Sequence, residues 1–333
     1  MMDDERRGEV SGRDAPAGAV EVLRVRFGTC SPFVPREMPG SGRRRQDRHC
    51  VATLYRPAGM TAPRPAVVVA HGLGGPTPER EHRYGAWLAE RGHVALVTDS
   101  FGSRGVGASG ELWRALRVTT AMMLADAYAA LGYLRTRSDV RGDAVSIIGF
   151  SYGGMVSVLC SYAQMRDLFA QAADHAFAGH ASYYGCSIPR LEQGRTTGAP
   201  VLMLLGGKDR NVSVERSEAI AVDLRTGGSP VEVHLYPQAY HQWDGADHRK
   251  RHISFSLRDC HIRVCADGTL LDEKAGKPFD GFLSRFAFLG RHVSLKGYET
   301  LRDEAVLADS DTRLARLLAE VEARPRPAAL SAA

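Results

Sequence analysis

The stretch Ala144-Val-Ser-Ile-Ile-Gly-Phe-Ser-Tyr-Gly-Gly154 decides the fold. It begins as a short apolar run typical of a buried strand, and the residues from Tyr152 to Met165 read as a helix. Between the two elements, Gly149-Phe-Ser-Tyr-Gly153 matches the pattern G-x-S-x-G. In a sharp strand-to-helix turn of this kind, small residues flank the serine because larger side chains would clash. The turn would lift the Ser151 hydroxyl above the sheet, whereas the alternative is an ordinary strand-to-helix connection.

Buried strands alternate with helices on both sides of this turn. Fully apolar strands are typical of a parallel sheet covered on both faces, and we expect them at 66–70, 94–97, 144–148 and 201–205. Less uniform strands are expected at 178–184 and 231–236, and helices at 79–91, 115–137, 152–165 and 213–225. The segments 20–27 and 49–55 alternate apolar and polar residues, so they predict an antiparallel edge. The pattern predicts a doubly wound α/β fold with a mostly parallel sheet.

The chain is expected to form one domain, over residues 19–323, between disordered tails at 1–18 and 324–333. About sixteen residues separate Tyr184 from Val201, which is too few for a large helical cap domain. An extra segment at about 248–290 fits the alternating pattern poorly. Within it, 253–257 and 261–264 predict a small hairpin, with Asp267-Gly268 as turn residues.

Composition excludes several classes of protein. Of the 333 residues, 44% are hydrophobic, which is too many for a disordered chain, and no run approaches the ~18 apolar residues of a membrane-spanning helix. Six cysteines are too few for a disulfide scaffold. The net charge of +5 is small, and the cluster Arg43-Arg44-Arg45 with Arg48 lacks interleaved aromatic residues, so we expect a solvated loop rather than a nucleic-acid contact, and no nucleic-acid partner. Residues 1–18 lack an apolar segment of the secretory type, so we expect a cytoplasmic protein with reduced thiols, including Cys260 and Cys265.

A serine is a weak nucleophile unless a base and an orienting acid activate it. In this arrangement the acid and then the histidine follow the serine along the chain. Asp209 follows the strand at 201–205, and His241 follows the strand at 231–236. Ser151, Asp209 and His241 are therefore the predicted catalytic residues. Three other histidines could in principle act as the base but do not directly follow a predicted strand: His234, His248 and His252.

A second backbone N–H is needed near the end of an earlier strand to bind the oxyanion. His71-Gly-Leu-Gly-Gly75 follows the strand at 66–70, so Leu73 and Tyr152 are the predicted donors. His71 is expected to be structural.

Two other patterns carry less weight. Gly105-Val-Gly-Ala-Ser-Gly110 matches G-x-G-x-x-G but does not directly follow the first strand, as a dinucleotide site requires. His248 and His252 lack a cysteine pair with zinc spacing and enclose three basic residues, so no metal or other cofactor is expected.

The chain resembles the α/β-hydrolase superfamily and, within it, the dienelactone hydrolase-like family. The similarity spans roughly residues 50 to 245 and is carried by Ala70-His-Gly-Leu-Gly-Gly75, Asp99-Ser-Phe-Gly-Ser-Arg-Gly105, Ile148-Gly-Phe-Ser-Tyr-Gly-Gly154, Gly207-Lys-Asp209 and Tyr236-Pro-Gln-Ala-Tyr-His241. The resemblance implies hydrolysis of an ester, lactone or related acyl compound without a cofactor. The name-giving enzymes carry a cysteine where this chain has Ser151, and an arginine near the position of Gly245.

The expected function is therefore cleavage of a small-molecule ester or lactone through Ser151, His241 and Asp209. Candidate substrate contacts are Arg104, Phe150, Arg210, Tyr240 and Trp243. Alternatives on the same three residues are a thioesterase, an acyltransferase or a peptidase. Alternatives of other classes are a binding protein that kept the fold and, with less support, a nicotinamide-dependent oxidoreductase. No membrane partner is expected, and the segment at 248–290 would either rim the site or form a homodimer contact.

Overall fold

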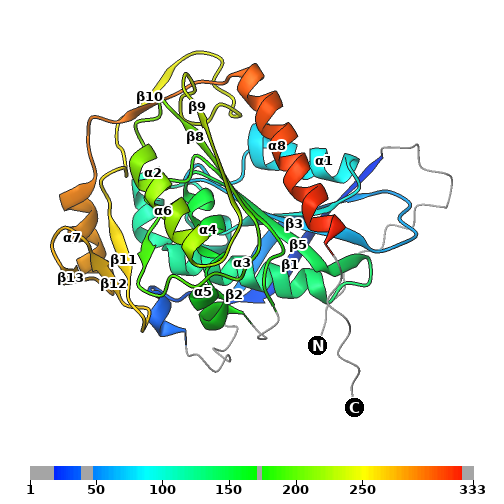
Figure 1. Cartoon of the computed structure of the whole chain (residues 1–333), viewed down its shortest axis with the longest axis horizontal. Coiled ribbons are helices and arrows are strands. Elements are labelled where there is room, and N and C mark those ends of the chain that lie inside the picture. The colour runs from blue at the N-terminus through cyan, green and yellow to red at the C-terminus, as the bar shows by residue number, and fades with distance from the viewer. Residues whose placement is uncertain (1–18, 39–47, 171–174, 325–333) are drawn as a thin grey trace.

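Residues 19–38, 48–170 and 175–324 are described by the computed structural model of the chain (Figure 1). An eight-stranded sheet forms its centre, in the order β1-β2-β4-β3-β5-β6-β8-β9. The bounds of these strands are β1 Val20–Thr29, β2 Arg48–Pro57, β3 Arg64–Ala70, β4 Val94–Asp99, β5 Val140–Phe150, β6 His180–Tyr183, β8 Val201–Gly206 and β9 Val231–Tyr236.

Six of the eight strands, from β4 to β9 in the sheet order, run parallel to one another. In β3, every side chain from Ala66 to Ala70 is buried, as expected for a strand covered on both faces. Strand β2 runs antiparallel to both β1 and β4, which confirms the predicted antiparallel edge. The mostly parallel sheet confirms the predicted doubly wound α/β fold.

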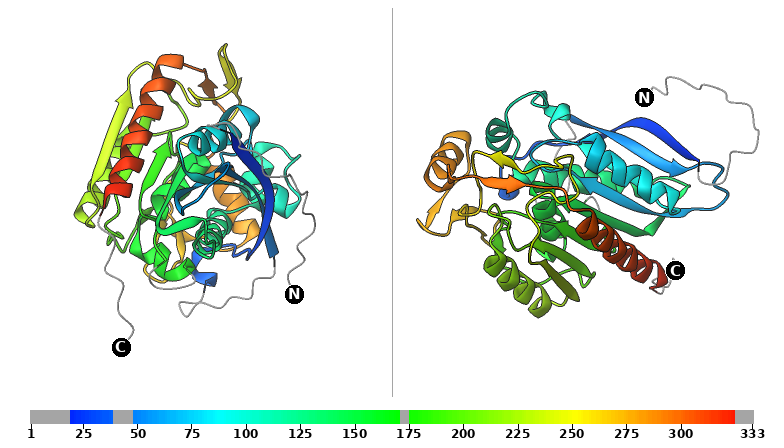
Figure 2. Two further views of the ribbon diagram at one scale, coloured as in Figure 1. Left: turned by 90° about the vertical axis from the view of Figure 1, so that its right-hand side faces the viewer. Right: turned by 90° about the horizontal axis from the view of Figure 1, so that it is seen from above.

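Helices cover both faces of the sheet. Helices α1 and α8 lie side by side on one face, joined by an ion pair between Arg83 and Asp311 (Figure 2). On the other face α3 packs against α4 and α5. The helices are α1 Arg83–Glu90, α2 Glu111–Arg117, α3 Thr120–Arg135, α4 Tyr152–Leu159, α5 Ala163–Phe169, α6 Val214–Thr226, α7 Phe282–His292 and α8 Glu304–Ala323. Shorter turns are η1 Pro35–Glu37, η2 Pro78–His82 and η3 Gly102–Arg104.

Two predicted helices are each divided in the structure. The pattern at 115–137 corresponds to α2 and α3, because Thr119 is extended and its side chain caps α3 by accepting the N–H of Met122. The pattern at 152–165 corresponds to α4 and α5, which are separated by an extended Tyr162. Buried residues lie on both sides of each break, so periodicity alone did not reveal it.

The extra segment folds onto the carboxyl end of the parallel strands. In the structure this segment is longer than the predicted 248–290 and runs from 251 to 300. It contributes β10 Arg251–Ile253, β11 Ile262–Val264, β12 Leu270–Asp272, β13 Lys277–Pro278, α7 and β14 Tyr298–Thr300. The predicted hairpin was wrong in its pairing. The turn at Asp267-Gly268 joins β11 to β12, and β10 pairs instead with β14. A further short strand, β7 Arg190–Leu191, lies parallel to β11.

No large cap domain is inserted between β6 and β8, where β7 is the one regular element in the part of the chain that the structure describes. Within the described ranges, no helix is both long and apolar enough to cross a membrane. The predicted tail at 1–18, residues 325–333 of the predicted tail at 324–333, and Arg43-Arg44-Arg45 of the basic cluster lie outside the described residues. Arg48, predicted to belong to a loop, is the first residue of β2. All six cysteines are free thiols.

Candidate active site

Ser151 occupies a strained turn between β5 and α4. Its φ is +52°, in the region that favours glycine, and it connects a strand directly to a helix. The two flanking glycines have no room for a side chain. A Cβ on Gly149 would lie 2.0 Å from the carbonyl oxygen of Gly153, and one on Gly153 would lie 2.2 Å from that of Ala70. The G-x-S-x-G pattern is thus a steric requirement of this turn.

The three residues predicted to act together do lie together. Nε2 of His241 is 2.9 Å from Oγ of Ser151, and Nδ1 of His241 is 2.6 Å from Oδ2 of Asp209. The serine lies at the end of β5, the aspartate after β8 and the histidine after β9. His241 is fully buried, and 4% of Ser151 is exposed. The carboxyl ends of three parallel strands thus bring distant residues to one edge of the sheet.

The aspartate loop is held by the extra segment. Oδ1 of Asp209 accepts the backbone N–H of Asn211, at 2.7 Å. The side-chain oxygen of Asn211 in turn accepts the N–H of Leu257, at 2.8 Å. Ser256 donates its hydroxyl to the carbonyl of Arg210. The loop that carries the acid is therefore bonded to residues near 256, well outside the sheet.

The two backbone N–H groups predicted to bind an oxyanion, those of Leu73 and Tyr152, are free of other hydrogen bonds within the described part of the chain. Tyr152 opens helix α4, where the helix dipole favours negative charge. The guanidinium of Arg114 donates to the carbonyl of Leu73 at 2.8 Å, which holds the next peptide of the same turn.

The turn after β3 rests on a buried ion pair. The Glu81 carboxylate accepts hydrogen bonds from the Arg80 guanidinium and from the backbone N–H of Thr77, both at 2.9 Å. The backbone N–H of Gly72 also donates to this carboxylate, at 3.3 Å. Burial alone would raise the pKa of Glu81, but Arg80 and the hydrogen bond from Thr77 hold that pKa below its usual value. His71 has both ring nitrogens engaged, with the Gly72 carbonyl and the Ser100 N–H, and is structural as expected.

Two tyrosine rings enclose the His241 imidazole. The ring centroid of Tyr184 lies 4.7 Å from that of His241, and that of Tyr298 lies 4.8 Å away. Tyr184 follows β6 and donates its hydroxyl to Asp244. Burial raises the pKa of Asp244. Tyr298 belongs to β14, so one side of the histidine is contributed by the extra segment.

A cysteine lies beside the serine. Sγ of Cys186 is 3.7 Å from Oγ of Ser151, and the cysteine is fully buried. Burial raises the pKa of the Cys186 thiol to about 12, so the group is protonated and neutral at ordinary pH.

Three of the expected substrate contacts are not available to a substrate in this structure. Phe150 and Trp243 are fully buried; Phe150 packs against Tyr84, and Trp243 packs against Tyr184. Arg104 is tied to Asp126 at 2.6 Å, and it lines a different pocket. Their positions next to catalytic motifs in the sequence were misleading, because neighbouring residues of a strand or turn point in different directions.

The other two expected contacts lie on loops close to the site. Arg210 is exposed and follows Asp209, and Tyr240 precedes His241 and packs against the ammonium groups of Lys208 and Lys250. Neither is bonded to Ser151. Of the alternative histidines, His234 approaches Asp309, and His248 and His252 are exposed. The Gly105–Gly110 pattern runs from η3 to α2 rather than from a strand.

Several supporting residues were not predicted. Tyr184, Asn211, Asp244 and Tyr298 carry no motif, and the Arg80-Glu81 pair looks like an ordinary helix start. A polar residue directly after a strand end is a weak signal, and it could have drawn attention to Asn211. Tyr298 lies 57 residues beyond His241, and no local pattern connects the two.

Comparison with known proteins identifies the family of the chain. The model of the dienelactone hydrolase family matches residues 51–254, which is more than half of the chain. The Bacillus subtilis (strain 168) protein YtaP, described as a hydrolase, is 26% identical over 210 residues, covering 52% of this chain and 70% of that protein. A Yersinia pestis protein described as a carboxymethylenebutenolidase is 26% identical over 215 residues, covering 62% of this chain and 79% of that protein.

Solved structures share the fold at lower identity. One described as a dienelactone hydrolase from Klebsiella pneumoniae is 19% identical with a TM-score of 0.52, covering 67% of this chain and 88% of that one. A dienelactone hydrolase-like promiscuous phosphotriesterase from metagenomic libraries is 18% identical with a TM-score of 0.56, covering 90% of this chain and 98% of that one. The chain therefore belongs to the dienelactone hydrolase family and is a carboxylic ester hydrolase with the α/β-hydrolase fold.

Proposed function

We propose that the chain hydrolyses small-molecule esters or lactones through a Ser151-His241-Asp209 triad and a covalent acyl-enzyme. The observation that carries this proposal is the continuous hydrogen-bond chain from Asp209 through His241 to Ser151, at 2.6 and 2.9 Å. Both distances lie within the range that proton transfer requires.

In the first half of the reaction, Oγ of Ser151 attacks the carbonyl carbon and His241 takes the serine proton. Asp209 accepts a hydrogen bond from the Nδ1–H of His241, which leaves Nε2 free to act as the base, and the carboxylate charge stabilises the imidazolium that forms. The N–H groups of Leu73 and Tyr152 stabilise the tetrahedral oxyanion. His241 then gives its proton to the leaving alkoxide, and the acyl group remains on Ser151.

In the second half, water replaces the leaving group. His241 removes a proton from the water as it attacks the acyl carbon, and the same two N–H groups stabilise the second oxyanion. Collapse of this intermediate releases the acid and restores the Ser151 hydroxyl. For a lactone, the acid and the alcohol leave as one molecule.

The neutral Cys186 thiol favours the serine as nucleophile. Its pKa of about 12 keeps the thiolate scarce, and no hydrogen bond connects Sγ to His241. A serine nucleophile is also consistent with thioester or amide substrates. A panel of an ester, a thioester and an anilide with the same acyl group would rank these leaving groups by kcat/KM.

The test is labelling by a fluorophosphonate probe together with turnover of p-nitrophenyl acetate and butyrate. In Ser151→Ala, we expect labelling to disappear and kcat to fall by about 10⁵-fold, because the nucleophile is removed. Ser138→Ala is the matched control, since Ser138 is exposed and precedes β5, whose other end leads into Ser151. It should label and turn over like the parent chain.

Full labelling of a folded Ser151→Ala variant would overturn the assignment of the nucleophile. Failure of the folded parent chain to label or to hydrolyse any member of the panel would favour the non-catalytic binding protein instead.

A further inference from the structure

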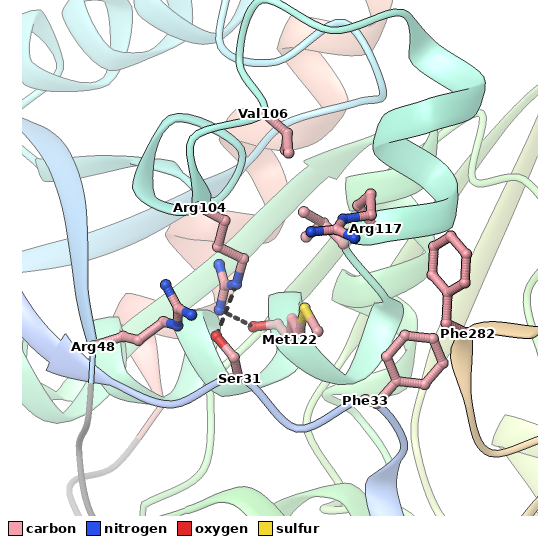
Figure 3. Close-up of a pocket in the computed structure, with 9 residues that line it drawn as sticks. Ser31, Phe33, Arg48, Arg104, Val106, Arg117, Met122 and Phe282 are labelled. Carbon is pink, nitrogen blue, oxygen red and sulfur yellow. Dashed lines mark hydrogen bonds between the residues drawn. The ribbon is translucent and has the colours of Figure 1, made fainter.

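A second pocket opens beside the antiparallel edge of the sheet, away from the triad. Its volume is about 300 Å³. Its walls come from five separate parts of the chain: the residues after β1, the start of β2, the turn η3 with Val106, the end of α2 with the beginning of α3, and the start of α7 (Figure 3). Ser151, His241, Asp209, Leu73 and Tyr152 do not line it. The mechanism proposed above makes no use of this pocket.

Three arginines line the pocket, and Figure 3 shows Arg48 and Arg117 on either side of Arg104. The central one is fully committed to the protein. Its guanidinium bonds to both carboxylate oxygens of Asp126, at 2.6 and 3.0 Å, and to the hydroxyl of Ser31 at 3.1 Å. It also donates to three backbone carbonyls, those of Cys30, Ser100 and Met122. Arg104 therefore forms the base of the pocket, and Asp126 balances its charge.

The outer two arginines are not balanced in this way. Among the described residues, neither Arg48 nor Arg117 has a carboxylate within ion-pair distance. Arg117 lies 5.5 Å from the ring centroid of Trp113 and 5.8 Å from that of Phe282, so its guanidinium is held by aromatic faces rather than by an acid. Both side chains are exposed and keep their donors available.

No acidic residue lines the pocket among the described residues. Two acids near its lining residues in the sequence are engaged elsewhere: Glu37 accepts the backbone N–H of Phe33 at 2.9 Å, and Asp280 forms an ion pair with Arg36. Three guanidinium groups therefore line the pocket, and one carboxylate, that of Asp126, balances the central one. Like charges that converge on one space repel each other, and an anion between them relieves that repulsion. The planar guanidinium matches a carboxylate or a phosphate group in particular.

The remaining lining is apolar. Phe33 and Phe282 form one side, and Val106, Val118 and Met122 contribute the rest. A bare inorganic anion would leave these side chains without contacts. We propose that this pocket binds a small organic anion, with a carboxylate or phosphate group between Arg48 and Arg117 and an aromatic or branched apolar body against Phe33 and Phe282.

A hydrogen bond connects the lining of the pocket to the residue after the nucleophile. Val118 lines the pocket, and its carbonyl accepts the hydroxyl of Tyr152 at 3.4 Å. Tyr152 follows the nucleophile along the chain, but its own side chain does not line the pocket. The bound anion therefore does not occupy the position of the ester, and binding should persist when Ser151 is blocked.

The test is calorimetric titration of the full Ser151→Ala chain with phenylacetate and with phenyl phosphate. The neutral 2-phenylethanol serves as the comparison. We expect one molecule of at least one anion to bind, with a dissociation constant of about 1 mM or lower for a ligand of this size. The neutral alcohol should bind about tenfold more weakly or not at all, and the anion's affinity should fall as salt is added. The tighter anion identifies the preferred head group.

Variants locate the site. Arg48→Gln and Arg117→Gln should each weaken anion binding about tenfold, because each removes a charged hydrogen-bond donor. Arg24→Gln is the matched control, since Arg24 is an exposed arginine on β1 that does not line the pocket. It should change the affinity by less than about twofold. Circular dichroism of each variant establishes that it is folded.

Several results would overturn the proposal. These are equal binding of the alcohol and the anions, unchanged affinity in both pocket variants, or no binding of either anion to the folded chain. Loss of binding after the parent chain is phosphonylated at Ser151 would place the anion in the ester site instead. Because the titration uses Ser151→Ala, its outcome does not depend on the proposed hydrolytic function.

Discussion

The turn around Ser151 and the extra segment at 251–300 both shape the same site, but they do so in opposite ways. In the turn, residues close together in the chain do the work: the end of β5, two glycines and the start of α4 position the Ser151 hydroxyl and the N–H of Tyr152. The extra segment acts from a distance, through the ring of Tyr298 against His241 and the N–H of Leu257 on Asn211.

This difference teaches that the reacting groups and their supports are encoded differently. The serine turn tolerates almost no change, because every alternative side chain collides with backbone. The support from the extra segment consists of ordinary packing and single hydrogen bonds, each of which contributes modestly. Substitutions in the first region should therefore act on folding and chemistry together, and those in the second should act by small steps.

The largest effect is expected from a glycine in the turn. Gly153→Ala would place a Cβ 2.2 Å from the carbonyl of Ala70, so the turn must distort. We expect a loss of about 3 kcal/mol or more in unfolding free energy, together with loss of esterase activity. The same change at Gly290, inside α7 with nothing within 4 Å, should be neutral or stabilise by about 0.5–1 kcal/mol. Denaturant unfolding of both variants makes the comparison, and equal effects would contradict it.

The next largest effect concerns the ion pair beneath the turn after β3. Glu81→Gln leaves the buried Arg80 without its counter-charge, and we expect a loss of about 3 kcal/mol at neutral pH. Because the folded-state pKa of Glu81 is depressed, its contribution is fully present above its ordinary pKa of 4.5 and is lost as pH falls through the lower folded value. The difference in unfolding free energy between the parent chain and Glu81→Gln should therefore narrow as the pH falls below 4.5. Denaturant titrations at decreasing pH measure this difference. If it stayed constant down to the lowest pH at which both proteins are folded, the role of the ion pair would be refuted.

A smaller effect is expected where the extra segment meets the histidine. Tyr298→Ala removes one of the two rings that enclose His241, and kcat should fall about tenfold because the imidazole is less well positioned. Tyr298→Phe keeps the ring and should stay within about twofold of the parent chain. Steady-state kinetics with p-nitrophenyl acetate distinguish the two. If the Phe variant lost as much activity as the Ala variant, the hydroxyl rather than the ring would be responsible.

The smallest effect is expected from the hydrogen bonds that tie the aspartate loop to the extra segment. Asn211→Ala leaves the N–H of Leu257 without its acceptor and should cost about 1 kcal/mol of unfolding free energy. Ser256→Ala removes a hydroxyl that donates to the carbonyl of Arg210 and should cost less. The two changes act on one loop, so the loss of unfolding free energy in the double variant should differ from the sum of the losses in the two single variants. Strict additivity would show that they are independent.

The sequence was sufficient for the parts of the molecule that are local. The apolar strands, the antiparallel edge and the serine turn were predicted because each depends on a short run of residues. Asp209 and His241 were also placed, since both directly follow recognisable strands. The breaks at Thr119 and Tyr162 were missed because buried residues continue on both sides of each break and no Gly or Pro marks it.

The sequence pattern predicted neither the direction of individual side chains nor the pairing of strands far apart in the chain. Phe150 and Trp243 adjoin catalytic residues in the chain but point into the core, and Arg104 pairs with Asp126 through a contact that no spacing reveals. The pairing of β10 with β14 joins segments about 45 residues apart, across a loop of irregular structure. Such contacts depend on the whole fold rather than on a local preference.

The thiol beside the nucleophile has a consequence for covalent inhibition. Two potential nucleophiles, Cys186 and Ser151, lie 3.7 Å apart, so a reagent small enough to reach one is close to the other. With a thiol pKa of about 12, only about one molecule in 10⁵ carries a thiolate at neutral pH. Alkylating agents that select for sulfur should therefore spare this site, whereas organophosphorus reagents should modify the oxygen. Selectivity between neighbouring atoms would then be set by protonation rather than by access.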